Sequence, residues 1–176
     1  MTGPLPNVNI RATSVSEWLR QRRRLQAQDR WSTRLAELHY IQAVTHDAER
    51  VVLAGWTQHT WYTAAGPQCS TVGCAAPFDR ACLVGAIVYA AGGPAGVRSQ
   101  LTVRTLRLTW HTLFRPGRQM AAWCSPPDRR AAEVRDLTQW NDAPSRRAGD
   151  VVELLRATRA AAIAEASAVR GKSIAA

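Results

Sequence analysis

Hydrophobic and polar positions follow a helical period near the start of the chain. Residues 1–12 form a leader with glycine and proline, and then Ser14 and Glu17 form a capping box, which predicts a helix from about Val15 to Asp29. At 100° per residue, the helix has two contrasting sides. Its apolar side holds Val15, Trp18 and Leu25, and its basic side holds Arg20, Arg23, Arg24 and Arg30.

Beyond Asp29 the apolar positions change phase. In a continuous helix, Trp31, Leu35 and Leu38 would project from the arginine side. We therefore predict a break near residues 30–32, followed by a second helix from about Thr33 to Ala54 with a broad apolar stripe. Gly55 is expected to end it as a left-handed cap, with Trp56 folding back onto the last turn.

The rest of the chain alternates loops and helices. Turn signals without a sustained period predict a loop over residues 57–80, and a second long loop leads to Asp128. Helices are expected at 82–91, 99–114 and 131–137, and a last helix is expected after a cap at Ser145. No strand pair is predicted. The fold class is all-α, a compact single domain of five or six helices with two long loops.

We divide the 176-residue chain into three parts. Residues 1–32 are expected to form a flexible leader and a basic amphipathic helix, residues 33–170 a helical core domain, and residues 171–176 a disordered tail. The length suits one hydrophobic core. No basic patch precedes an apolar signal core, and the most apolar run is short and broken by Gly92, Gly93 and Pro94. We expect a cytoplasmic protein without membrane contact.

The net charge of +10 favours an anionic partner. However, Lys172 is the only lysine, and an arginine bias of this kind is also what a GC-rich genome produces. The charge lies at the two ends of the chain, because residues 41–100 carry three basic and three acidic groups. A binding surface for nucleic acid or an acidic protein would therefore combine the two ends, with Arg20, Arg23, Arg24 and Arg30 as candidate contacts.

Three of the four cysteines lie within fourteen residues, at 69, 74 and 82. Cys69 and Cys74 have four residues between them in a loop, which is half of a zinc-ligand pattern, and the second pair of ligands is missing. The alternative is two ordinary loop thiols. Cys82 begins an apolar helix, where a buried thiol is typical, although its position near Arg80 also suits a lowered thiol pKa.

Other polar residues give weaker signals. His39 and His46 share the outer face of their helix, which predicts solvent exposure. Asp142 is a candidate general acid or base, but Asn141 and Asp142 also suit a turn before a helix. The sequence contains no Gly-rich phosphate loop, no Gly-x-Ser-x-Gly elbow and no His-Glu-x-x-His pair.

The order of several short motifs resembles a family of actinobacterial and phage proteins, domain of unknown function 6197. The resemblance covers about residues 35–160. It rests on Gly55-Trp56-Thr57-Gln58, Cys82-Leu-Val-Gly85-Ala86, Trp140-Asn141-Asp142 and the apolar positions from Val151 to Leu155. It implies a compact helical domain with no assigned activity.

Each shared motif also has a structural interpretation. Gly55 permits the cap, Gly85 permits close approach of helices, Trp56 and Trp140 fill the core, and Asn141 and Asp142 satisfy amides of a turn and the following helix. A ligand pocket formed by Trp56, Trp140 and Asp142 is the functional alternative.

Three functional hypotheses follow from these patterns. The leading one is a non-enzymatic helical module that binds a macromolecular partner, nucleic acid above others. The second is a small metal- or thiol-dependent enzyme or sensor that uses the Cys69/Cys74 loop, and the third is a structural or assembly protein. The sequence leaves the oligomeric state open.

Overall fold

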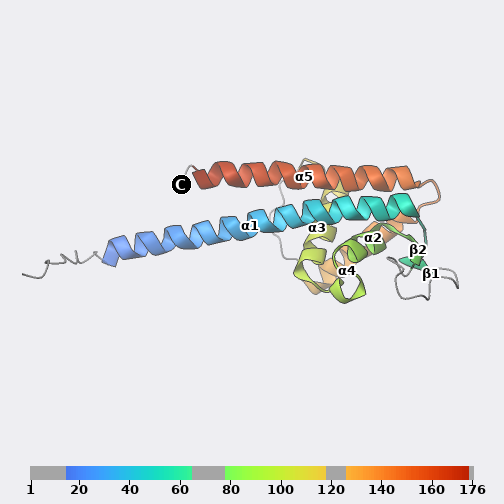
Figure 1. Ribbon diagram of the computed structural model, residues 1–176, viewed down its shortest axis with the longest axis horizontal. Helices are drawn as coiled ribbons and strands as arrows, with labels where there is room; N and C mark the ends of the chain where they lie inside the picture. Colours follow the sequence, from blue (N-terminus) through green and yellow to red (C-terminus); the bar gives the residue numbers. More distant parts are fainter. Residues whose placement is uncertain (1–14, 65–77, 118–125, 175–176) are drawn as a thin grey trace, which may run out of the picture.

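The computed structural model describes residues 15–64, 78–117 and 126–174. They form a mostly helical fold with one small β-sheet (Figure 1). The elements are α1 (Val15–Ala54), β1 (Tyr62–Ala64), β2 (Phe78–Ala81), α2 (Leu83–Ala90), the 3-10 helix η2 (Pro94–Gly96), α3 (Gln100–Phe114), α4 (Pro127–Asn141) and α5 (Ala148–Ile174). The predicted helical fold class is confirmed.

Helices α1 and α5 lie antiparallel along the long axis of the molecule (Figure 1). Buried Leu38 and Ile41 of α1 pack with Ala162 and Ala166 of α5, and the small alanines allow the two helices to approach closely. Leu108 of α3 completes this cluster. One side of the α1–α5 pair is therefore covered by the shorter helices.

Charged groups reinforce the α1–α5 contact. Glu49 is 7% exposed and accepts hydrogen bonds from Arg156 Nε at 2.7 Å and from Arg159 Nη1 at 2.9 Å. Farther along the pair, Arg34 Nη2 lies 2.6 Å from Glu165 Oε1. Because Glu49 is buried with two partners, its charge is compensated inside the fold.

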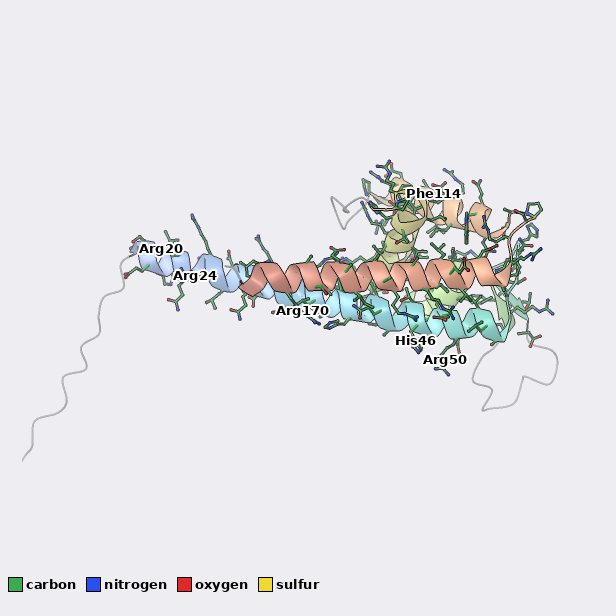
Figure 2. All side chains as sticks on the ribbon, turned by 90° about the horizontal axis from the view of Figure 1, so that it is seen from above. Arg20, Arg24, His46, Arg50, Phe114 and Arg170 are labelled. Atoms are coloured by element: carbon green, nitrogen blue, oxygen red, sulfur yellow. The ribbon has the colours of Figure 1, made fainter. Side chains whose placement is uncertain are left out.

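The predicted break near residues 30–32 is wrong, because α1 is one helix of 40 residues. The change of phase in the apolar pattern has another cause. Leu35 packs against the cluster that α1 shares with α5, so the apolar positions move to the side that α5 covers. Residues 15–30 are exposed apart from half-buried Ala27, and this part of α1 extends past the end of α5 (Figures 1 and 2).

The main core lies between the C-terminal half of α1 and the shorter helices. It contains buried Val52 of α1, Leu83 and Ile87 of α2, Leu137 of α4 and Leu155 of α5. Helix α2 is buried from Leu83 to Val88, as its continuous apolar run predicted. All of these elements thus share one hydrophobic core.

Several predicted helix ends differ from the structure. Helix α4 begins at Pro127 rather than 131, because proline suits the first turn of a helix. Ser145 does not begin the last helix, which starts at Ala148 with the Asp150 carboxylate accepting the Arg147 amide hydrogen at 2.9 Å. Helix α5 continues to Ile174, into the segment predicted as a tail.

A short antiparallel sheet was not predicted. Strands β1 and β2 pair Tyr62 with Ala81 and Thr63 with Arg80. Trp56 forms a parallel bridge to Ala81. Gly55, next to this bridge, does not have the predicted positive φ, and its role comes from the nearby strand β2. A side chain there would place a Cβ within 3.0 Å of the Asp79 carbonyl oxygen, so Gly55 permits a close backbone approach.

Candidate functional site: a polar cluster and a basic helical arm

The sequence-predicted residues fall into two separate places. The motif residues Trp56, Cys82 and Asn141 meet near the start of α2, whereas the predicted arginines lie on the projecting end of α1. We call the first the Asn141 cluster, and it includes the residues that contact Asn141. We call residues 15–30 the arm.

Asn141, the last residue of α4, is fully buried, and its side chain is hydrogen-bonded through both the oxygen and the nitrogen. Its Oδ1 accepts the Trp56 indole Nε1 hydrogen at 3.0 Å and the Leu83 amide hydrogen at 3.1 Å. Its Nδ2 donates to the Thr57 carbonyl at 3.2 Å and to Asp142 Oδ1 at 2.9 Å. One amide side chain therefore joins the segment after α1, the start of α2 and the end of α4.

The neighbouring residues extend this cluster. Asp142 Oδ1 accepts the His59 amide hydrogen at 2.8 Å, and Gln58 Nε2 donates to the carbonyls of Asn141 and Ala143. His59, whose amide makes this contact, has a φ of 64°, in the left-handed region that few residues other than glycine adopt. The prediction that Asn141 and Asp142 serve the following helix is therefore wrong, because the backbone amides that donate to their side chains belong to Leu83 and His59, more than 50 residues earlier.

Asp142 has the geometry of a positioning group. Its Oδ2 lies 3.8 Å from Nδ1 of His59, whose side chain is 78% exposed. The backbone amide of His59 and the side chain of Asn141 already occupy Oδ1. This arrangement fixes the backbone of residues 57–59.

Cys82 is buried and forms the N-cap of α2, where its Sγ accepts the Gly85 amide hydrogen at 3.4 Å. Burial raises the pKa of the Cys82 thiol, and the amide hydrogen bond only partly opposes this. The predicted buried thiol at Cys82 is therefore confirmed, and the alternative of a thiol activated near Arg80 is not supported. A raised pKa is the opposite of what an activated nucleophile needs.

The predicted packing roles of the remaining motif residues hold in part. Trp56 and Trp140 both pack against the main core, and the Arg146 guanidinium lies 3.9 Å from the Trp140 ring centroid. Gly85 was expected to admit a helix. It instead faces the Trp61 carbonyl oxygen, to which an added Cβ would come closer than 3.0 Å.

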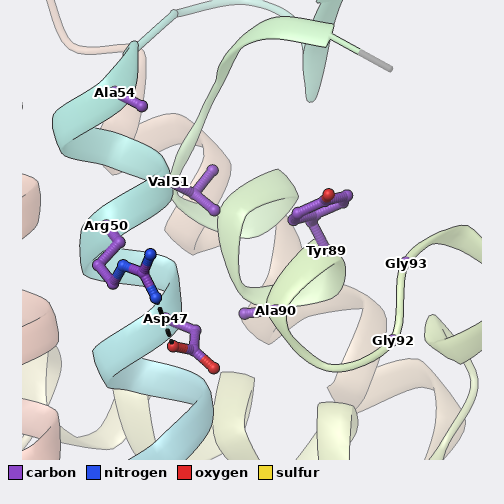
Figure 3. A pocket seen from close by; sticks show the side chains of 8 residues that line it. All are labelled: Asp47, Arg50, Val51, Ala54, Tyr89, Ala90, Gly92 and Gly93. Atoms are coloured by element: carbon purple, nitrogen blue, oxygen red, sulfur yellow. Dashed lines mark ion pairs between the residues drawn. The ribbon is translucent and has the colours of Figure 1, made fainter. Parts of the chain in front are cut away.

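A groove of about 730 Å³ lies between α1 and α2 (Figure 3). The residues that line it are Asp47, Arg50, Val51, Ala54, Tyr89, Ala90, Gly92 and Gly93. Figure 3 shows the Asp47–Arg50 ion pair at the α1 side, with Nη1 and Oδ1 3.8 Å apart. Val51, Ala54, Ala90 and the Tyr89 ring make the rest of the lining largely apolar.

The arm carries the predicted arginine side. Every residue from 15 to 30 is exposed except Ala27, which is half-buried. Figure 2 shows Arg20 and Arg24 on the part of α1 beyond the end of α5. Arg20 Nε donates to the Ser16 carbonyl at 3.3 Å, a contact within the same helix. Five arginines against Glu17 and Asp29 give the arm a net charge of +3.

Trp18 lies on the opposite side of the arm from the arginine face. At 100° per residue it is about 160° from Arg20, and the Arg22 guanidinium lies 5.2 Å from its ring centroid. Arg22 was not among the predicted contacts. Its position beside Trp18 follows from the four-residue spacing, which could have been noticed in the sequence.

His39 and His46 are exposed, as predicted, but each lies against an arginine of α5. Arg170 Nη2 is 2.8 Å from His39 Nε2, and Arg159 Nη1 is 3.1 Å from His46 Nδ1. The heptad spacing of the two histidines indicated a shared face. The α5 partners could not be found from that spacing.

The zinc hypothesis concerns residues outside the described part of the chain, namely Cys69 and Cys74. Within residues 15–64, 78–117 and 126–174, no three or more His, Cys, Asp or Glu side chains gather as a metal site. In the same ranges, no helix combines the length and the apolar character needed to cross a bilayer.

Comparison with known families identifies the central part of the chain. The model of the family of unknown function DUF6197 matches residues 39–161. No curated protein and no solved structure matches the chain. The matched region contains the whole Asn141 cluster but begins after the arm.

Proposed function

We propose that the chain, which belongs to DUF6197, is a cytoplasmic module that binds nucleic acid through the arm. The exposed arginines of the arm precede the region that the family model matches. In this proposal, Arg20, Arg23, Arg24 and Arg30 contact backbone phosphates. The Asn141 cluster holds the helical core together and takes no part in binding.

One observation carries the proposal. The predicted arginines occupy a helical segment whose residues are exposed, apart from half-buried Ala27, and which extends past α5 (Figure 2). In the helical core, by contrast, several arginines are committed to acidic partners, as Arg156 and Arg159 are to Glu49. Exposed guanidinium groups on a projecting segment can reach phosphates without breaking an internal ion pair.

The shape of the arm favours duplex over single-stranded nucleic acid. A helix of 16 residues is about 24 Å long, and a helix fits the major groove of B-DNA. Single-strand binding commonly combines cations with stacked aromatic rings, but Trp18 lies opposite the arginine face. A strand that follows Arg20 and Arg24 would not reach the Trp18 ring.

Fluorescence anisotropy with a labelled DNA duplex tests the proposal across a salt series. If the four arginines neutralise about four phosphates, the affinity should fall about 150-fold between 50 and 200 mM salt, with a logarithmic slope near −3.6. The Arg20→Gln/Arg23→Gln/Arg24→Gln variant should reduce the slope by about 3. Glutamine keeps a high helix propensity, so the arm should stay helical.

A matched control removes the same charge elsewhere. Arg98, Arg135 and Arg147 are exposed, and their replacement by glutamine also lowers the net charge by three. The control should keep the wild-type slope if binding is local to the arm. Equal losses in the two triple variants would show attraction to overall charge, and absence of binding at 50 mM salt would refute the proposal.

A further inference from the structure

The arm has a second face that nucleic-acid binding does not explain. Eight large hydrophobic side chains are exposed in the described residues, and four of them lie in the arm, between residues 15 and 25. Their exposed fractions are 75% for Val15, 51% for Trp18, 41% for Leu19 and 55% for Leu25. Such a concentration on one projecting segment indicates a surface that is covered in the functional state.

Three of these four residues, Val15, Trp18 and Leu25, follow a coiled-coil spacing, and Leu19 lies beside that line. Positions 15, 18, 22, 25 and 29 are separated alternately by three and four residues, which places them along one line of the helix. The line holds Val15, Trp18, Arg22, Leu25 and Asp29, and we call it the seam. The contact of the Arg22 guanidinium with the Trp18 ring agrees with this placement.

The charges in the seam specify its partner. Arg22 and Asp29 are seven residues apart, and both are exposed. In an antiparallel pair with twofold symmetry, placing Arg22 of one copy opposite Asp29 of the other also places Asp29 opposite Arg22. A parallel pair would place like charges together. We propose that the seam binds the seam of a second copy of this chain in antiparallel orientation.

The same alignment accommodates the apolar residues. The two Leu25 side chains meet near the twofold axis, since they are the residues between Arg22 and Asp29. Trp18 of one copy then lies opposite Thr33 of the other, a smaller residue that is exposed on α1. One register therefore covers large apolar groups and pairs both charges, as an interface core and rim require.

Other occupants fit the seam less well. Asp29 would repel a phosphate backbone, and burial in a lipid surface would place Arg22 and Asp29 among acyl chains. In the antiparallel pair, the arginine faces of both arms remain directed outward. The proposal therefore goes beyond nucleic-acid binding and does not depend on it.

Sedimentation velocity over a concentration series tests the pairing. Two helical segments make an interface at the small end of the usual range, so we expect a weak dimer in rapid exchange. Arg22→Glu places a second carboxylate opposite Asp29, and Asp29→Arg places a second guanidinium opposite Arg22. Each change should raise the dimer dissociation constant by at least about tenfold, because like charges then face each other.

Recombining the two charges gives the sharpest result. An equimolar mixture of Arg22→Glu and Asp29→Arg proteins should form a heterodimer, because opposite charges again meet on both sides. The double variant Arg22→Glu/Asp29→Arg should regain the homodimer. Neither result is expected from a general change in charge, and circular dichroism would show that each variant keeps its helices.

Leu25→Ser should also weaken the dimer. Its matched control is Ile163→Ser, which changes a 50% exposed side chain on α5 outside the seam, and it should leave association unchanged. Wild-type protein that stays monomeric at about 1 mM would overturn the proposal, as would single charge variants that dimerise normally. If instead Leu25→Ser alters binding to duplex DNA or anionic vesicles while the protein is monomeric, the seam has another partner and the proposal is wrong.

Discussion

Replacement of Asn141 by leucine tests the structural role assigned to the Asn141 cluster. Leucine has the same number and branching of side-chain heavy atoms as asparagine but can neither accept nor donate a hydrogen bond. The change leaves two donors without their acceptor, the Trp56 indole Nε1 and the Leu83 backbone amide. Leu83 is fully buried, so water cannot easily replace the lost oxygen.

The expected loss of stability follows from these contacts. A buried donor left without a partner costs about 1–3 kcal/mol. The Leu83 amide should cost an amount near the upper end of this range, and the half-buried Trp56 indole an amount near the lower end. Asn141→Leu should therefore lower the free energy of unfolding by about 3–4 kcal/mol, a large part of the roughly 5–15 kcal/mol typical of a domain.

Urea unfolding followed by circular dichroism measures this loss. With a slope near 2 kcal/mol per M, the midpoint should fall by about 1.5–2 M. Gln139→Leu changes an exposed residue of the same helix and should stay within about 0.5 kcal/mol of wild type. If Asn141→Leu is no more destabilising than this control, the cluster does not hold the fold together.

A double-mutant cycle separates the Trp56 bond from the rest. Trp56→Phe removes the indole donor, and Asn141 Oδ1 keeps the Leu83 amide. In the Asn141→Leu background the indole bond is already lost, so Trp56→Phe should cost about 1 kcal/mol less than in wild type. Strict additivity of the two changes would show that the 3.0 Å contact contributes nothing to stability.

Two further predictions concern Gly55 and Glu49. Gly55→Ala should lower the free energy of unfolding in urea by about 1–3 kcal/mol, because the new Cβ would meet the Asp79 carbonyl oxygen. The control Gly149→Ala, at a helical position with nothing within 4 Å, should instead raise it by about 0.5–1 kcal/mol. Equal effects of the two changes would contradict the proposed contact at Gly55. Burial acts to raise the pKa of Glu49, but hydrogen bonds from Arg156 and Arg159 leave that pKa lowered. The stability that a lowered carboxyl pKa provides is present above the unfolded pKa near 4.3 and disappears as the pH falls through the folded pKa. The difference in free energy of unfolding between wild type and Glu49→Gln should therefore shrink below about pH 4. A difference that does not change with pH would disprove this.

Local sequence signals were sufficient for most helices, and they failed where a distant segment decides the conformation. The sequence correctly predicts the apolar stripe of α1, but the change of phase in that stripe also predicts a break that the structure does not contain. An amphipathic pattern reports which side of a helix is covered, and that side changes where α5 begins to cover Leu35. The α5 neighbour is far away in sequence, so the pattern alone could not separate the two explanations.

The candidate sites show the same limit. Gly55 was assigned to a left-handed cap by a local rule, whereas the constraint comes from Asp79 on β2. Asn141 was recognised as part of a motif, but its partners at Trp56 and Leu83 become visible only in three dimensions. By contrast, the arginine side of the arm was predictable, because exposure of charged residues opposite an apolar face depends only on helical geometry.

The continuity of α1 connects the helical core with the arm in a way that a broken helix would not. An isolated helix of about 16 residues is only marginally stable in water, because its first turn is costly to form. Here the arm extends a helix whose later turns are already fixed by the core, so its nucleation cost is met before any partner arrives. A partner that binds the arm therefore has less conformational entropy to remove, which favours affinity from a small number of contacts. The same helix carries the arginine face and the seam on opposite sides, so pairing of two arms and binding of nucleic acid do not compete for one surface.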